Sequence, residues 1–177
     1  MKKVLMLASV ASMINQFNMP NIRLLQEMGF EVHVACNFKE GSTCSDEKVE
    51  EIKKELTQMG IPYYQIDFSR NVFKLNRAVK AYVQVVKLLK QEKYEFIHCH
   101  SPIGGVVGRL AGYRTKTKVM YTAHGFHFFK GAPKAYWMFI YPVEKFCSYF
   151  TDTLITINHE DYNRAKKKFH AKRTSYI

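Results

Sequence analysis

Short runs of apolar residues alternate along the chain with segments whose apolar positions recur every three or four residues. Runs of the first kind are typical of strands buried inside a parallel sheet, and the longer segments are typical of amphipathic helices. The alternation predicts an α/β fold: a doubly wound, mostly parallel sheet of about seven strands, with right-handed crossovers and helices on both faces. The expected strands are residues 4–8, 31–36, 61–66, 95–98, 118–122, 153–157 and 174–177.

The residues between these runs predict the helices. They span residues 13–28, 46–59, 75–89, 102–111 and 160–169, and one more begins near Pro133. Glycine follows the first two, Asp46 is the expected N-cap of the second, and Pro102 suits the first helical turn. The third presents one apolar face, made of Leu75, Val79, Tyr82, Val83, Val86 and Leu89.

The chain is long enough for one domain, and its charge is uneven. It has 177 residues, 47% of them apolar, and a formal net charge of +12. Residues 1–92 carry 13 basic and 10 acidic side chains, whereas residues 93–177 carry 14 and 5. An anionic partner is therefore expected to meet the second half. Nucleic acid is not expected, because charge alone supports it and no recognition motif is present.

Several protein classes are excluded by short patterns. The four cysteines form no C-x-x-C pair, which excludes a disulfide scaffold and a zinc ribbon and favours a reduced, cytoplasmic protein. No apolar run approaches the ~18 residues of a membrane span. The apolar N-terminus could pass for a signal peptide, but a helix and a second buried strand follow it, so residues 4–8 are better interpreted as a first strand.

Ligands of such sheets bind beyond the carboxyl ends of the strands, where two loops carry suitable groups. Small residues at 9–14 would let backbone N–H groups approach a phosphate, although a plain connector explains them equally well. The absence of G-x-G-x-x-G disfavours dinucleotide binding. Arg70 could bind a phosphate or carboxylate after the third strand, or be a solvated loop residue.

Histidines follow the next two strands. His98 and His100 alternate onto one face, but spacing provides no third ligand, so no metal site is predicted. His100 could reach a ligand, whereas His98 is better explained as a core residue. After the fifth strand, His124 could hydrogen-bond a sugar hydroxyl, Gly125 would permit close approach, and His127 follows. A surface turn with two incidental histidines is the alternative.

Aromatic and basic residues are mixed in the last third of the chain. Most rings of residues 126–150 are expected to pack in a core or between domains. Some of this region could instead contact an anionic membrane, although runs of charge are usually solvated. The membrane candidates are Lys130, Lys134, Trp137, Lys166, Lys167 and Lys168.

Three motifs resemble one enzyme family: Ile-His-Cys-His-Ser-Pro at 97–102, Tyr-Thr-Ala-His-Gly-Phe-His-Phe at 121–128 and Thr-Asp-Thr-Leu-Ile-Thr-Ile-Asn at 151–158. The chain is similar over nearly its whole length to the N-terminal domain of bacterial family 4 glycosyltransferases. Among these it most resembles enzymes of capsular, exopolysaccharide and O-antigen synthesis. The resemblance implies a Rossmann-like domain that forms one half of a GT-B architecture.

The resemblance also implies a mechanism and site residues. The N-terminal domain of this family holds the acceptor, often a lipid-linked glycan, and the C-terminal domain holds a nucleotide sugar; transfer is retaining and needs no metal or cofactor. His124 corresponds to the histidine beside the transferred sugar, with Gly125 and His127 in the same motif. Arg70 and His100 correspond less specifically to acceptor-side residues. The loop facing the donor diphosphate corresponds to Ser9, Val10, Ala11, Ser12 and Met13.

One family motif has no convincing counterpart. Glu47 and Glu55 have the spacing of the donor-binding Glu-x7-Glu pair, but they lie on a helix expected to face solvent. Residues 1–177 are therefore expected to form a single acceptor-side domain without the donor-binding domain, and to be inactive alone. The alternative is a non-catalytic basic module that binds an anionic membrane, a lipid-linked glycan or an acidic partner. Either would work in the cytoplasm or peripherally at the inner membrane face.

Overall fold

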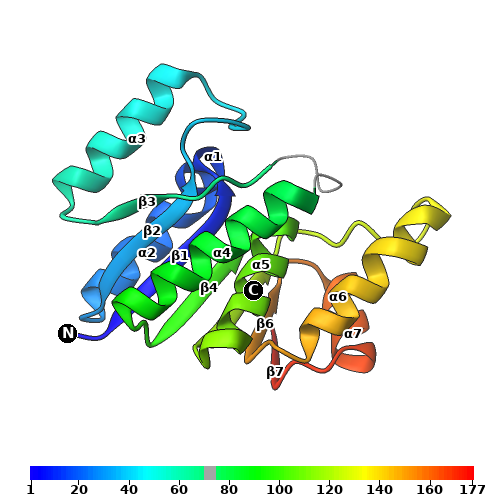
Figure 1. Ribbon diagram of the computed structural model, residues 1–177. Helices are drawn as coiled ribbons and strands as arrows, with labels where there is room; N and C mark the ends of the chain where they lie inside the picture. The colour runs from blue at the N-terminus through cyan, green and yellow to red at the C-terminus, as the bar shows by residue number, and fades with distance from the viewer. Residues whose placement is uncertain (70–74) are drawn as a thin grey trace.

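A seven-stranded parallel sheet organises the computed structural model, which describes residues 1–69 and 75–177 (Figure 1). The strand order is β3-β2-β1-β4-β5-β6-β7. The chain therefore builds outward from β1 in one direction and then returns to β4 on its other side. The strands are β1 (Lys3–Val10), β2 (Glu31–Asn37), β3 (Tyr63–Gln65), β4 (Phe96–His100), β5 (Lys118–Ala123), β6 (Thr153–Thr156) and β7 (Arg173–Tyr176). The predicted doubly wound parallel sheet is confirmed.

Helices cover both faces of the sheet. They are α1 (Ala11–Met13), η1 (Ile14–Asn18), α2 (Met19–Glu27), α3 (Asp46–Gln58), α4 (Leu75–Glu92), α5 (Pro102–Thr115), η2 (Tyr136–Ile140), α6 (Tyr141–Ser148) and α7 (His159–Lys168). Side chains of β1 alternate between two cores: Met6 packs with α2 and α3, whereas Leu7 packs with α4 and α5. Both faces of β1 are therefore apolar, as its uninterrupted apolar sequence predicted.

Two details of the helices differ from expectation. Ser45, not Asp46, is the N-cap of α3, because its Oγ accepts the backbone N–H of Lys48 at 3.3 Å and Asp46 already lies in the first turn. The segment after β1 is helical but widens into the π-helix η1 over Ile14–Asn18. Such widened turns change the direction of their side chains and often lie at functional sites.

The buried face of α4 is only partly the expected one: Leu89 is buried and Tyr82 and Val86 pack against the core, as predicted, but the rest of the face differs. The helix buries Ala81, Val85, Leu88 and Leu89, whereas Leu75, Val79 and Val83 are 73%, 62% and 58% exposed. Its sequence contains two apolar stripes about a quarter turn apart, and periodicity alone does not decide between them. The structure buries the stripe that contains Ala81, Val85 and Leu88, and this side of α4 lies against α5.

A row of glycines lets α5 lie unusually close to the sheet. A Cβ atom on any of them would overlap or press on atoms beneath: Ser101 and β1 under Gly104, the Tyr121 ring under Gly105, Cys99 under Gly108 and Val119 under Gly112. The four glycines recur at helical spacing and all of them are buried. This close approach holds α5 against β1, β4 and β5 together.

A buried ion pair joins α5 to α6. The guanidinium of Arg109 is 2.8 Å from the carboxylate of Glu144, and both side chains are almost wholly buried. Arg109 also donates to the Gly105 carbonyl and lies over the ring of Tyr121, whose hydroxyl donates to Glu144. Because every charged group has partners, the pair fixes the position of α6 without leaving an unpaired charge in the core.

Filling the space between α5 and the sheet should destabilise the protein. We expect Gly108→Val to lower the free energy of unfolding by about 2–3 kcal/mol, because the new side chain collides with Cys99 and Leu7 in a close-packed interior. Urea titration followed by circular dichroism measures this loss. The matched control is Arg114→Val on the exposed side of α5, expected to change stability by less than about 0.5 kcal/mol. Equal effects of the two substitutions would contradict the packing account.

Candidate functional site

Two histidines of β4, His98 and His100, lie on the same face of the sheet, beside the end of β5. Strand pairing sets His98 opposite Met120 and His100 opposite Thr122. Nε2 of His98 is 2.8 Å from the Thr122 hydroxyl, and the side chain is buried. His98 is thus a core residue with a hydrogen-bond partner, as the sequence indicated.

A third histidine continues this row. His124 follows β5, and its Nε2 is 3.1 Å from Nδ1 of His100. One of these nitrogens carries the shared proton, so the hydrogen bond couples the tautomers of the two rings. The ring of Phe17, aimed by the π-helix η1, packs at 4.7 Å on the ring of His124. The hydrogen bond to His100 and the packing of Phe17 therefore orient His124, and His100 does not engage its Nδ1.

Burial keeps these histidines neutral. Loss of water lowers the pKa of His98 to about 4 and holds the pKa of His100 well below its ordinary value, and the neighbouring histidines add to both effects. The pKa of the half-buried His124 is also lowered by desolvation. At neutral pH the row therefore offers hydrogen bonds and not positive charge. Within the described residues, no partner reaches the buried Nε2 of His100.

The end of β1 and the helix α1 that follows it directly lie on the other side of this edge. The backbone N–H of Ser9 donates to Oγ of Ser101 at 3.2 Å, so that amide is already satisfied. Oγ of Ser12 accepts from the N–H of Thr43, which leaves its hydroxyl proton available as a donor. Ser101 itself has a φ of 66°, a strained value for a non-glycine residue, beside the first turn of α5.

The segment after His124 is held by α7. Gly125 has a φ of 114°, which favours glycine there. Buried Asp161 accepts the backbone N–H of Phe126 at 2.8 Å, and Arg164 donates to the carbonyl of Phe128 at 2.7 Å. Sequence reasoning did not assign Asp161 this role, although the Asn158-x-x-Asp161 capping pattern was a signal for it.

Comparisons with known proteins identify the family of this chain. The sequence model described as "Glycosyl transferase 4-like" matches residues 3–158. The chain belongs to this family. It is 44% identical to EpsD of Bacillus subtilis (strain 168), a protein named as a glycosyltransferase, over 93% of this chain and 40% of the relative.

One further relative and one solved structure are less similar to this glycosyltransferase 4-like domain. An Escherichia coli UDP-Gal:alpha-D-GlcNAc-diphosphoundecaprenol alpha-1,3-galactosyltransferase is 26% identical over 88% of this chain and 38% of its own length. The crystal structure of Anabaena Alr3699/HepE with UDP and glucose has a TM-score of 0.65 and 15% identity, over 100% of this chain and 44% of that chain. This likeness establishes the fold, one half of a GT-B architecture. The chain spans about two fifths of the length of the curated relatives it matches.

The structure brings together only some of the site residues that the sequence suggested. His100 and His124 are in contact, and the same edge is bordered by the end of β1 (Ser9 and Val10) and by α1 (Ala11, Ser12 and Met13), so the expected loop is strand and helix. His127 is exposed and its ring packs against Tyr136 instead. Arg70 lies outside the described residues. Glu47 and Glu55 lie on α3, where Glu55 pairs with Arg23.

The membrane candidates are spread over two elements. Lys130, Lys134 and Lys166 to Lys168 are exposed. Trp137 is turned inward, packing on Phe128, Tyr141 and the guanidinium of Arg164. In the described part of the chain, no helix is long and apolar enough to cross a bilayer. Nor do residues 1–69 and 75–177 contain a group of three or more His, Cys, Asp or Glu side chains arranged to hold a metal ion.

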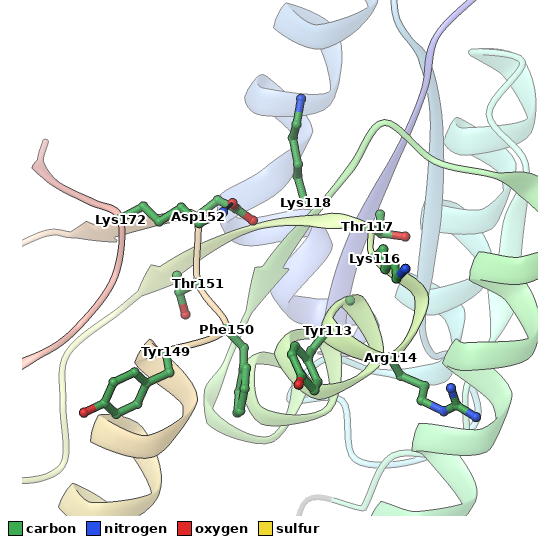
Figure 2. A pocket seen from close by; sticks show the side chains of 11 residues that line it. Tyr113, Arg114, Lys116, Thr117, Lys118, Tyr149, Phe150, Thr151, Asp152 and Lys172 are labelled. Carbon is green, nitrogen blue, oxygen red and sulfur yellow. Dashed lines mark hydrogen bonds and ion pairs between the residues drawn. The ribbon is translucent and has the colours of Figure 1, made fainter.

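A depression of about 580 Å³ lies at the opposite edge of the sheet, away from the histidines (Figure 2). It is lined by the end of α5, the start of β5, residues 149–152 between α6 and β6, and Lys172 just before β7. Tyr113 and Phe150 lie side by side in it, and Lys172 pairs with Asp152 at 2.6 Å. Arg114 and Lys118 point away from each other, so their charges do not converge on a common point. Cavity size therefore does not identify the family site in this domain.

Neutral His98 should make stability depend on pH. Between pH 6.5 and about 4 the unfolded chain binds a proton that folded His98 does not, so stability falls as pH falls through this window. We expect His98→Gln to reduce that slope by up to about 1.4 kcal/mol per pH unit, measured by urea titrations at several pH values. Thr122→Val, which keeps the buried histidine, should lower stability but keep the slope. An unchanged slope in His98→Gln would contradict this assignment.

Proposed function

We propose that this chain is the acceptor-binding half of a retaining glycosyltransferase. The enzyme would move a sugar, a hexose in type, from a nucleotide-sugar donor to a lipid-linked glycan during synthesis of a cell-surface polysaccharide. The observation that carries the proposal is the contact of His124 with His100 at the carboxyl edge of β4 and β5, within the family match. The E. coli relative, named for a UDP-sugar donor and a diphosphoundecaprenol acceptor, supports this substrate class.

In this proposal His124 acts as a neutral hydrogen-bonding group. With Nε2 engaged by His100, its Nδ1 side faces the transferred sugar. Residues 9–13, with the hydroxyl of Ser12 among them, lie beside the departing nucleoside diphosphate. Catalysis then comes from positioning and electrostatic support of the leaving group, not from a covalent nucleophile on this domain. Gly125 keeps the approach to His124 free of a side chain, and Arg70, His100 and His127 are assigned to the acceptor side.

A second domain of the full-length protein supplies the donor site in this proposal. The nucleotide sugar binds there, as the co-substrate of the reaction, and the acceptor binds to residues 1–177. The extra length of the relatives supports this division, since each is about two and a half times as long as the match. The domain alone then does not turn over. A lipid-linked acceptor sets the reaction at the inner face of the plasma membrane, with the protein peripheral to it.

Substitution of His124 tests the chemistry. In the full-length protein we expect His124→Ala to lower kcat for transfer by about 10²–10³-fold, because a fixed hydrogen-bond donor or acceptor at the reacting sugar is lost. The assay follows radiolabelled sugar from a panel of UDP-sugars into lipid-extractable product. His159→Ala, an exposed histidine on α7, is the control and should stay within about twofold of wild type. Wild-type turnover in His124→Ala would remove this residue from the mechanism.

A further inference from the structure

The helix formed by η2 and α6 exposes an apolar outer face. We call it the outer helix face and define it by six side chains that are 39–63% exposed: Tyr136, Met138, Phe139, Val143, Phe146 and Tyr149. A helix that covers a sheet normally presents polar residues to water. Here the solvent side carries aromatic and aliphatic groups along its length, and the helix lies at the periphery of the molecule (Figure 1). An apolar surface of this kind marks a site of contact.

The inner side of the same helix is fully engaged. Glu144, Cys147 and Ser148 are buried, and Ile140 and Tyr141 pack against the core. The Arg109 ion pair neutralises Glu144 inside the protein. The helix therefore cannot turn its outer face inward without breaking that pair, so the exposure of the face belongs to the folded domain.

The charges around the outer helix face are positive. Between residues 96 and 151 Glu144 is the only acidic residue, against seven basic ones. Lys134 and Lys145 lie on the helix itself. A second depression, of about 410 Å³, separates the helix from α7, and Lys167 and Lys168 line its far side. Glu160 also lines this depression, but its carboxylate is 2.8 Å from the guanidinium of Arg164. An apolar face bordered by lysines complements an anionic interface.

We propose that the outer helix face docks on the surface of an anionic bilayer. The aromatic side chains enter the boundary between headgroups and acyl chains, and the surrounding lysines contact lipid phosphates. The inference rests on the proposed function, which already requires a lipid-linked acceptor. It names the surface that meets the lipid: the helix follows His124 by one short loop that α7 holds in place, so docking brings this edge of the sheet to the membrane.

A second copy of the chain fits this face less well. A two-fold contact between outer helix faces would bring Lys134 and Lys145 of both copies together, and the one acid on this helix, Glu144, is buried and cannot pair with them. Like charges in such a contact oppose association. The remaining part of the full-length protein is the other possible cover, and the experiment separates it from the membrane.

Vesicle binding tests the proposal. The wild-type chain should co-sediment with vesicles of phosphatidylcholine containing 30% phosphatidylglycerol at low salt, and more weakly in 0.5 M NaCl or with phosphatidylcholine alone. The double variant Phe139→Ser/Phe146→Ser should bind at least about tenfold more weakly, since two buried rings are lost from the bilayer contact. Trp137 is the single tryptophan and neighbours this face, so brominated lipids should quench its fluorescence in the wild type only.

The matched control is Val79→Ser/Val83→Ser, which removes two similarly exposed apolar side chains from α4. It should bind vesicles like the wild type, and circular dichroism should show all variants folded. Equal loss of binding in the control would overturn the proposal, as would absence of wild-type binding at low salt. A lipid-free dimer that dissociates in Phe139→Ser/Phe146→Ser would replace the membrane with a second copy.

Full-length protein completes the test. Binding by the chain of 177 residues but not by the full-length protein would show that another part of the protein covers the face, and would overturn the proposal. Vesicle binding needs no sugar transfer, so His124→Ala should bind like the wild type. A wild-type full-length protein that binds vesicles but transfers no sugar therefore speaks against the proposed function alone, and intact transfer to a water-soluble acceptor with no vesicle binding speaks against docking alone.

Discussion

The close contact between α5 and the sheet is the constraint on which the rest of the domain depends. Four glycines let this helix lie directly on β1, β4 and β5, where any larger side chain would push it outward. The strained backbone at Ser101 turns the chain from β4 into the first turn of α5 and places its hydroxyl against the amide of Ser9. The ends of three strands are thereby fixed relative to one another. The positions of the histidines at those strand ends are therefore fixed as well.

The site built on this support is polar but uncharged. His98 is hydrogen-bonded to Thr122, and His100 is hydrogen-bonded to His124. Burial disfavours the protonated form of all three rings, so the domain presents fixed dipoles and not cations along this edge. Its positive charge lies elsewhere, on exposed lysines after β5 and on α7. Specific hydrogen bonding and general attraction to anions are thus carried by different parts of the molecule.

The sheet was predictable from sequence because buried parallel strands need continuous apolar runs, and each of the seven predicted strands lies within a few residues of its position in the structure. The strand predicted over residues 95–98 continues to His100 in the structure, since a histidine can be buried once its side chain has a hydrogen-bond partner. The contact of His100 with His124 depends on the order of the strands in the sheet, which the spacing of residues along the sequence does not reveal. The π-helix that aims Phe17 at His124 has no sequence signal that periodicity detects.

Side-chain direction was harder to predict than secondary structure. On α4 two apolar stripes compete, and the contact with α5 selects the one that contains Ala81, Val85 and Leu88. On η2 and α6 most aromatic residues were expected to pack in a core or between domains; in this domain Phe139 and Phe146 are exposed while Trp137 packs inward on Arg164. In both helices the decision belongs to tertiary contacts between segments far apart in the chain, which a single sequence does not display.

The buried pair of Arg109 and Glu144 has a consequence for how this domain can change over evolutionary time. Replacing either residue alone leaves an isolated charge in the interior, a loss of about 3–5 kcal/mol that exceeds the margin of many domains. Replacing both at once by apolar residues of similar size is tolerated far better. The two positions, 35 residues apart, are therefore expected to change together. Divergent relatives are expected either to keep both charges or to have lost both, with single-charge intermediates rare.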